Sequence, residues 1–276
     1  MQLRVDGKAV FAATGGRAFS AEAPVVVMIH GAGMDHIVWA LPARSLSHRG
    51  RAVLAVDLPG HGRSEGPALE SIGEMAGWLI RFLDAAGVGE AALCGHSMGA
   101  LIALEAAALA PARIRRLALL GVAARMPVHP DLLAAAKADP ALAADLITSW
   151  GHGPVGHFGG QPAPGLWLMG GGQSLLERAA PGVLANDLTA CNAYDTAPTA
   201  KRIACPTLFL LGVEDRMTPP VKAGPLAKAI AGSAITLLPG VGHMMMSEAP
   251  DAVIDALLGF LGPQAKGPEG VALRPL

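Results

Sequence analysis

The pentapeptide at residues 95–99, Gly-His-Ser-Met-Gly, could support nucleophilic catalysis by a serine hydroxyl. A serine is a weak nucleophile at neutral pH, so it needs a base within hydrogen-bond reach and an acid that orients this base. The pattern Gly-x-Ser-x-Gly is typical of a nucleophile elbow where a strand precedes it and a helix follows. Here an apolar run at 91–94 precedes the motif and strong helix formers fill 98–110, so Ser97 is the candidate nucleophile.

An acid and a histidine follow two later apolar runs of the chain. Asp215 lies in the loop after residues 207–211, and His243 lies in the loop after residues 234–238. The carboxyl ends of parallel strands meet at one edge of a sheet, so both side chains are expected near the serine. The chain order serine, aspartate, histidine is the order found in enzymes with such an elbow. Glu214 stands beside Asp215 and is the alternative acid.

These candidates require a sheet whose strands end at the same edge. Short apolar runs alternate with stretches rich in Ala and Leu, which predicts βαβ units. The runs are continuously apolar, which is typical of strands covered on both faces. The predicted fold class is therefore α/β, with a mostly parallel twisted sheet and helices on both faces. Strands are predicted at 24–29, 52–56, 91–94, 117–120, 207–211 and 234–238, with one or two edge strands in 2–13, and helices near 71–86, 98–110, 221–231 and 250–261.

Residues 124–199 interrupt this alternation. The segment is too long for an ordinary connection between two strands, and its sequence predicts further helices. We expect an inserted helical cap over the carboxyl ends of the strands, where open α/β sheets place their sites. Its helices are predicted at 131–149, 173–178 and 180–190, with a loop at 151–172. The predicted division of the chain is a core of 1–123 and 200–262, the cap at 124–199 and a flexible tail at 263–276.

The motifs together resemble the α/β-hydrolase superfamily, in its capped esterase, haloperoxidase and carbon–carbon hydrolase branch. The resemblance spans residues 30 to 243 and rests on four features in the family's order. They are His-Gly-Ala-Gly at 30–33 with Trp39 following, Asp-Leu-Pro-Gly-His-Gly-Arg-Ser at 57–64, the elbow, and the loops with Asp215 and His243. The resemblance implies that the serine is the nucleophile, that the histidine is its general base and acid, and that the aspartate orients the imidazole.

The resemblance also implies an oxyanion hole made of two backbone N–H groups. The residue after the nucleophile, Met98, would supply one of them. The loop after the first buried strand would supply the other, from Ala32 or from Gly33, and Ala32 is the preferred candidate. Lipase-like relatives carry His-Gly-Gly-Gly at this place, so Ala32 departs from their pattern but keeps a backbone donor.

Four residues near the site or in the cap are candidates for contact with a substrate. They are His96, Trp150, Trp167 and Met244. Apolar and aromatic side chains over the ends of the strands would line a pocket for an apolar acyl or aryl group. The alternative for each is a packing role, and for His96 packing is the preferred interpretation, as it is for Trp39.

The predicted activity is that of a serine hydrolase that cleaves a small, largely apolar carboxylic ester through an acyl-enzyme. Two alternatives use the same residues, namely a carbon–carbon bond hydrolase and a perhydrolase. A third alternative is a receptor that binds a small molecule without turning it over. The serine at the elbow argues against dehalogenases and epoxide hydrolases, because those members of the superfamily use an aspartate there.

Composition narrows the remaining function classes. The chain has 276 residues and a net charge of −1 without a basic stripe, so its expected partner is a small-molecule substrate and not a nucleic acid. The histidines and the three scattered cysteines lack metal-binding spacing, and no Gly-x-Gly-x-x-Gly follows a strand, so no metal and no cofactor is expected. No signal peptide and no apolar stretch of ~18 residues is present, which predicts a cytoplasmic protein without a membrane partner.

Overall fold

The computed structural model describes residues 1–157 and 167–262. The predicted tail at 263–276 and residues 158–166 of the predicted loop at 151–172 lie outside these described residues. Within the described ranges, no helix has both the length and the hydrophobicity needed to cross a bilayer.

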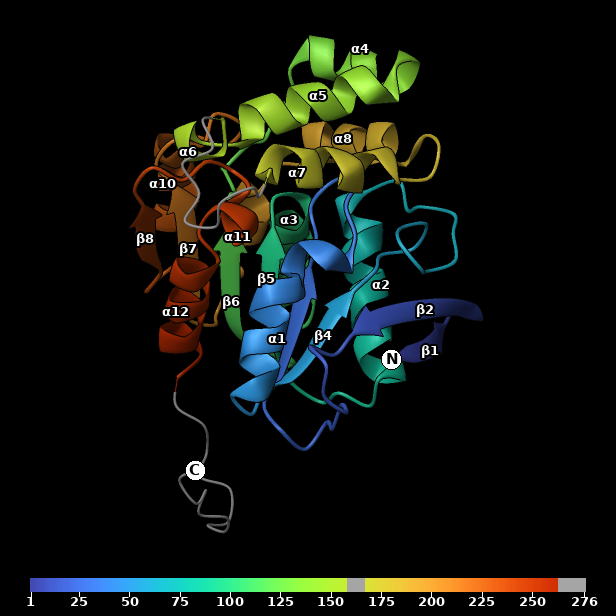
Figure 1. Ribbon diagram of the computed structural model, residues 1–276. Helices are drawn as coiled ribbons and strands as arrows, with labels where there is room; N and C mark the ends of the chain where they lie inside the picture. Colours follow the sequence, from blue (N-terminus) through green and yellow to red (C-terminus); the bar gives the residue numbers. More distant parts are fainter. Residues whose placement is uncertain (158–166, 263–276) are drawn as a thin grey trace, which may run out of the picture.

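One eight-stranded sheet forms the centre of the molecule, in the order β1-β2-β4-β3-β5-β6-β7-β8 (Figure 1). β2 runs antiparallel to both β1 and β4, and every pair from β4 to β8 is parallel. This arrangement confirms the predicted mostly parallel sheet, and residues 2–13 form two strands, of which β1 lies at the edge of the sheet. The strands are β1 (Gln2–Val5), β2 (Lys8–Ala13), β3 (Val25–Ile29), β4 (Ala52–Val56), β5 (Ala91–His96), β6 (Ile114–Leu120), β7 (Thr207–Gly212) and β8 (Ala234–Leu238).

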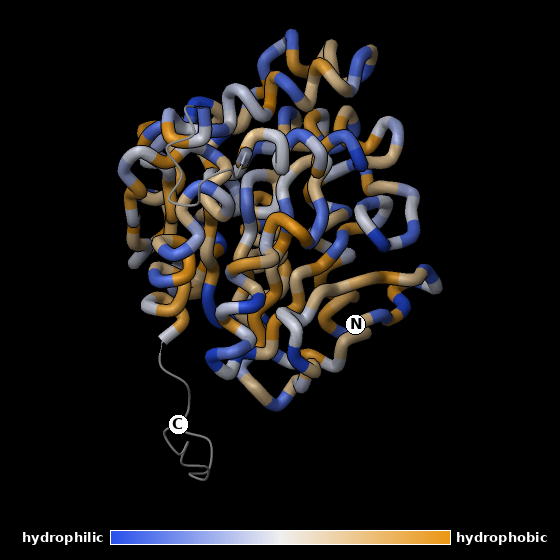
Figure 2. The backbone as a smooth tube through the Cα atoms, in the orientation of Figure 1, coloured by the Kyte–Doolittle hydropathy of each residue, from blue (hydrophilic) through white to orange (hydrophobic). Residues whose placement is uncertain are grey.

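Alternate residues of the strands pack against helices on opposite faces, because successive side chains of a strand point to opposite sides. On β3, Val25, Val27 and Ile29 belong to a core with α2 (Ile72–Ala85), α3 (Met98–Leu109) and α10 (Pro220–Ala229). Val26 and Met28 belong to a second core with α1 (Ala40–His48) and α12 (Pro250–Leu261). Figure 2 shows apolar residues running along the central strands, as burial on both faces requires.

The helices differ from the sequence prediction in several places. α6 (Pro154–His157) and the start of α7 (Leu168–Glu177) fall in the predicted loop at 151–172, and α9 (Ala197–Ala200) and α11 (Met245–Glu248) were not predicted. α1 was not predicted; its proline, Pro42, lies in the first turn, where a backbone N–H has no partner within the helix. The stretch predicted as helical at 131–149 is helical but divided in two, because Asp139 ends α4 (Pro130–Ala138) and caps α5 (Pro140–Gly151). The Asp139 side chain accepts a hydrogen bond from the Leu142 N–H, and Pro140 takes the first helical position.

The segment between β6 and β7 is helical and lies above the edge toward which the parallel strands point (Figure 1). A third apolar core joins its helices to Met34 and Met244 from the loops below them. This placement supports the proposal that residues 124–199 form a cap over the core. Besides α4 and α5, the segment contains α6 (Pro154–His157), α7 (Leu168–Glu177), α8 (Val183–Ala193) and α9 (Ala197–Ala200).

Candidate active site

Ser97 lies in the sharp turn between β5 and α3. Its backbone has φ 53° and ψ −117°, a conformation that a residue with a side chain rarely adopts. The two glycines of the motif are required by close backbone contacts. A Cβ atom on Gly95 would overlap the Gly99 carbonyl, and one on Gly99 would overlap the Ile29 carbonyl at the end of β3. The turn therefore has the form of a nucleophile elbow, with the strained serine at the start of a helix.

His243 and Asp215 are brought together by the loops after β8 and β7. The Nδ1 atom of His243 lies 2.8 Å from Oδ2 of Asp215, and both side chains are almost completely buried. The other carboxylate oxygen accepts hydrogen bonds from the N–H groups of Met217 and Thr218, at 2.8 and 2.7 Å. The Thr218 hydroxyl donates to Oδ2 of Asp215 at 2.7 Å and lies 3.2 Å from His243 Nδ1. Nothing in the sequence motifs identified Thr218.

These donors keep the carboxyl group of Asp215 ionised. Burial acting alone would raise its pKa, but the charge of His243, its hydrogen bond and the donors of Thr218 lower the pKa to about 2. Glu214, the alternative acid, has an exposed side chain, and no described residue donates a hydrogen bond to its carboxylate. The geometry therefore favours Asp215 over Glu214 as the partner of His243.

A glycine at the end of β6 makes room for the histidine ring. Gly121 has φ +58°, and a Cβ atom there would lie 3.0 Å from Cε1 and Nδ1 of His243. We expect Gly121→Ala to displace the ring and to lower kcat about 10-fold, because a shift of about 1 Å at a catalytic group can cost about 10²-fold. Gly232→Ala is the matched control, since Gly232 has φ +70° but no atom within 4 Å of the added methyl group.

Both variants place alanine in the left-handed region, so each loses about 1–2 kcal/mol of the free energy of unfolding from backbone strain. Only the Gly121 variant is expected to lose activity, measured as kcat on an activated ester with the unfolding free energy measured in parallel. Equal activity losses in the two variants would contradict a specific contact between Gly121 and His243.

Ser97 and His243 both line a cavity of about 620 Å³ between the sheet edge and the helices above it. Apolar side chains from α4, α5 and α8 form much of its wall, for example Leu132, Ile147 and Leu188. Trp150 lines the cavity, as predicted for a substrate contact. The charged groups among its described lining residues are Arg216 and Lys222.

The other three predicted contact residues do not line this cavity within the described ranges. His96 is completely buried, with its ring centroid 4.7 Å from that of His243, and burial lowers its pKa to about 3. Its Nε2 lies 2.9 Å from the His243 carbonyl oxygen, so it supports the His243 loop from below.

Trp167 is 69% exposed on the surface. Met244 is buried in the third apolar core, against which Trp150 and Met217 also pack. Tertiary packing, which the sequence pattern does not specify, decides these positions.

The geometry distinguishes the two candidates for the second oxyanion donor. The Gly33 N–H donates to Oδ2 of Asp187 at 2.9 Å, so it is directed toward the cap. Ala32 lines the cavity with Ser97, and no described residue accepts a hydrogen bond from its N–H. Met98 begins α3, so its N–H has no partner within the helix. Ala32 and Met98 therefore remain the candidate donors.

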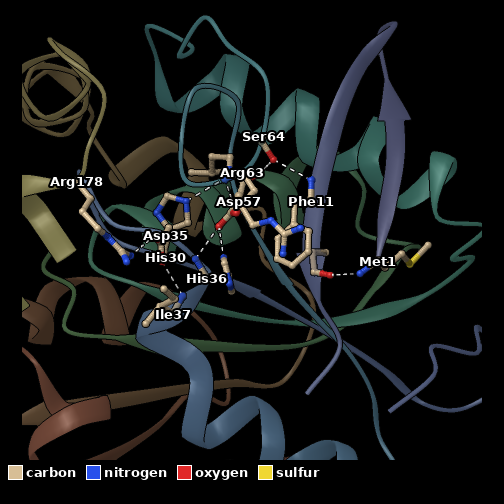
Figure 3. A network of polar contacts seen from close by, with 12 residues as sticks. Met1, Phe11, His30, Asp35, His36, Ile37, Asp57, Arg63, Ser64 and Arg178 are labelled. Carbon is tan, nitrogen blue, oxygen red and sulfur yellow. Dashed lines mark hydrogen bonds and ion pairs between the residues drawn. The ribbon is translucent and has the colours of Figure 1, made fainter. Parts of the chain in front are cut away.

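Asp57 organises the loops beneath the site (Figure 3). Its carboxylate accepts hydrogen bonds from the N–H groups of His36 and Arg63, at 2.7 and 2.9 Å, and contacts Nδ1 of His36 at 2.8 Å. Asp35, His36 and Asp57 offer donor atoms within 4.8 Å of one another, a grouping that sequence spacing did not reveal. Asp35 accepts from the Ile37 N–H and forms an ion pair with Arg178, so these carboxylates serve as hydrogen-bond acceptors that fix the loops.

The fold and this site define an α/β hydrolase. Residues 26–256 match the profile of the alpha/beta hydrolase family. The chain belongs to this family, which confirms the resemblance found in the sequence.

Several similar proteins are named for different hydrolytic reactions. A protein of Klebsiella pneumoniae subsp. pneumoniae named as a carbamate hydrolase, RutD, is 31% identical over 235 residues, which cover 80% of this chain and 85% of the relative. The enol-lactonase from Burkholderia xenovorans LB400 superposes with a TM-score of 0.85 at 27% identity, covering 95% of this chain and 99% of the enzyme. A thermophilic esterase gives a TM-score of 0.79 at 28% identity, covering 95% and 96% of the two chains. The names of these relatives support hydrolysis of a small molecule.

Proposed function

We propose that the protein is a serine hydrolase that cleaves a small, largely apolar carboxylic ester through an acyl-enzyme. The observation that carries the proposal is the shared cavity. Ser97 and His243 line the same cavity, while Asp215 holds the buried nitrogen of His243 at 2.8 Å. This combination supplies a nucleophile, a base and an orienting acid at one place.

In this proposal the Ser97 hydroxyl attacks the ester carbonyl carbon, and Nε2 of His243 takes the hydroxyl proton. Asp215 keeps the proton of the imidazole on Nδ1 and stabilises the imidazolium that forms. The N–H groups of Met98 and Ala32 bind the oxyanion, and each such donor contributes about 3–4 kcal/mol in the transition state. His243 returns its proton to the departing alcohol, and water then hydrolyses the acyl-enzyme by the same steps.

The composition of the cavity wall supports an apolar substrate. Leucine, isoleucine, methionine, valine and tryptophan side chains make up much of the described lining, which favours an alkyl or aryl group. The names of the similar proteins include an esterase, a lactonase and a carbamate hydrolase, and all three reactions attack an acyl carbon bonded to oxygen.

A series of p-nitrophenyl esters with increasing acyl length tests the proposal. We expect multiple turnovers with short and medium acyl chains and a decline in kcat/KM once the chain exceeds the cavity, since about 620 Å³ is an ordinary size for a small-ligand site. An aryl 1,3-diketone is included in the same screen. Faster cleavage of the diketone than of every ester would indicate a carbon–carbon hydrolase, and thermal stabilisation by ligand without turnover would indicate a receptor.

A further inference from the structure

The buried carboxylate of Asp187 connects the helices above the cavity to two loops, the loop that carries Ala32 and the loop after β4. Asp187 lies on α8, is completely buried, and presents a single oxygen, Oδ2, to two partners. This oxygen accepts a hydrogen bond from the Gly33 N–H at 2.9 Å and lies 2.8 Å from Nε2 of His61, in the loop after β4. The proposed ester hydrolysis uses neither the Asp187 side chain nor the His61 side chain.

His61 carries the positive charge of this pair. Its Nδ1 lies 3.0 Å from the Pro59 carbonyl oxygen and its Nε2 faces the Asp187 carboxylate, so both ring nitrogens face acceptors and both carry hydrogen. Burial acting alone lowers the pKa of His61, but the hydrogen bond and charge of Asp187 outweigh it and raise that pKa above its ordinary value. The neighbouring ring of His30 is neutral, because its pKa is lowered to about 4. Burial is the main cause of this lowering, and the charge of His61 is the second.

The two peptide groups around Ala32 are held from opposite sides. The Gly31 carbonyl accepts the Met34 N–H at 3.2 Å and lies 2.9 Å from Nδ1 of His30. The Gly31 carbonyl and the Ala32 N–H belong to one peptide group, and in a trans peptide they point in opposite directions. The two contacts that hold the carbonyl therefore also fix the direction of the Ala32 N–H. The following peptide is held by its own N–H, that of Gly33, which Asp187 binds from α8.

Side-chain packing fixes the same contact. A Cβ atom on Gly33 would lie 2.8 Å from Cδ1 of Leu184, one turn before Asp187 on α8. Gly33 has φ +66°, so the backbone reaches α8 in a conformation that favours glycine. The helix and the loop therefore form one packed and hydrogen-bonded unit at this point.

We propose that Asp187 is a positioning residue that holds the Ala32–Gly33 peptide so that the Ala32 N–H faces the developing oxyanion, and that His61 neutralises its charge. A lone carboxylate so close to the oxyanion hole would oppose the negative charge of the transition state. Paired with His61, it supplies the hydrogen bond without a net charge. The proposal rests on the proposed function of Ser97.

Asp187→Asn keeps the shape of the side chain but offers a weaker, neutral acceptor and no counter-charge for His61. We expect kcat on a short p-nitrophenyl ester to fall about 10- to 100-fold, less than the 10²–10³-fold typical for complete loss of an oxyanion donor. KM is expected to stay within about threefold of wild type. Butaneboronic acid forms a tetrahedral adduct with a serine nucleophile, so its affinity is expected to fall by the same factor as kcat.

Arg178→Gln is the matched control, because Arg178 also joins the helices above the cavity to a loop below, through Asp35 at 2.9 Å (Figure 3). Its kcat is expected within about twofold of wild type. Where Asp187→Asn does not fold, the double variant His61→Leu/Asp187→Val replaces the pair by apolar side chains, an exchange that buried ion pairs often tolerate. It removes the acceptor of the Gly33 N–H and is expected to show the same loss of kcat and of boronic acid affinity.

A folded Asp187 variant with wild-type kcat and boronic acid affinity would overturn the proposal, and so would an increase in KM alone. Neither result would affect the assignment of Ser97. If the wild-type protein showed no ester turnover that depends on Ser97, this result would contradict the proposed function itself, independently of the Asp187 variants.

Discussion

Ser97→Ala is expected to lower kcat for ester hydrolysis about 10⁶-fold, close to the rate that remains when a serine hydrolase retains only its binding site and oxyanion hole. The alanine removes the attacking oxygen and leaves the cavity wall otherwise in place. The folded structure is expected to persist, because the Ser97 side chain makes no capping hydrogen bond to α3. Alanine also has a Cβ atom, so the strain at φ 53° is the same in both proteins.

The measurement is single- and multiple-turnover kinetics with the best p-nitrophenyl ester, together with the melting temperature of both proteins. The variant is expected to keep its melting temperature within about 2 °C, since it neither opens a large cavity nor breaks a buried hydrogen bond. Residual activity above about 1% of wild type, with contamination excluded, would show that Ser97 is not the nucleophile.

Asp215→Asn is expected to lower kcat about 10⁴-fold, through the tautomer of His243. Oδ1 of Asp215 accepts hydrogen bonds from two backbone N–H groups. The amide nitrogen of an asparagine is a donor, so at the position of Oδ1 it would face two other donors. The amide nitrogen must then face Nδ1 of His243 and donate to it. The imidazole proton moves to Nε2, and the nitrogen that faces the cavity loses the lone pair that a base requires.

Glu214→Gln is the matched control for this variant, because it removes a carboxylate one residue away whose side chain is exposed. The Asp215 pKa of about 2 means that the wild-type carboxylate is ionised at every ordinary assay pH, so the comparison holds across pH 5–9. The kcat values of both variants on one ester decide which of the two carboxylates is the catalytic acid. A larger loss from Glu214→Gln would make Glu214 the acid.

The sequence predicted those parts of the fold that depend on local pattern. The apolar runs within β3 to β7 are buried, so these strands could be placed along the chain, although β5 extends to His96 and β6 begins at Ile114. β8 was placed in the same way, although Ile235 and Leu237 are about half exposed. The three candidate catalytic residues could therefore be placed at strand ends. Helix α1 was not predicted, although Pro42 lies in its first turn, where proline is tolerated. The break at Asp139 was missed because apolar residues continue on both sides of it.

The surroundings of the candidate site depend on contacts between distant segments, which a single sequence does not reveal. His61 and Asp187 are 126 residues apart in the chain and meet only because α8 lies over the loop after β4. The same contact occupies the Gly33 N–H and so distinguishes Gly33 from Ala32. Trp150 and Trp167 are both tryptophans of the predicted cap, yet one lines the cavity and the other is exposed.

The contact between Asp187 and Gly33 has a consequence for protein engineering. Exchanging residues 124–199 for the corresponding segment of a relative is an obvious route to new substrate specificity, since that segment forms much of the cavity wall. Such a chimaera would also exchange the acceptor of the Gly33 N–H and the counter-ion of His61. Grafts that retain an aspartate at position 187 therefore form the better starting library, while grafts without one leave a buried cation and a buried donor unpaired.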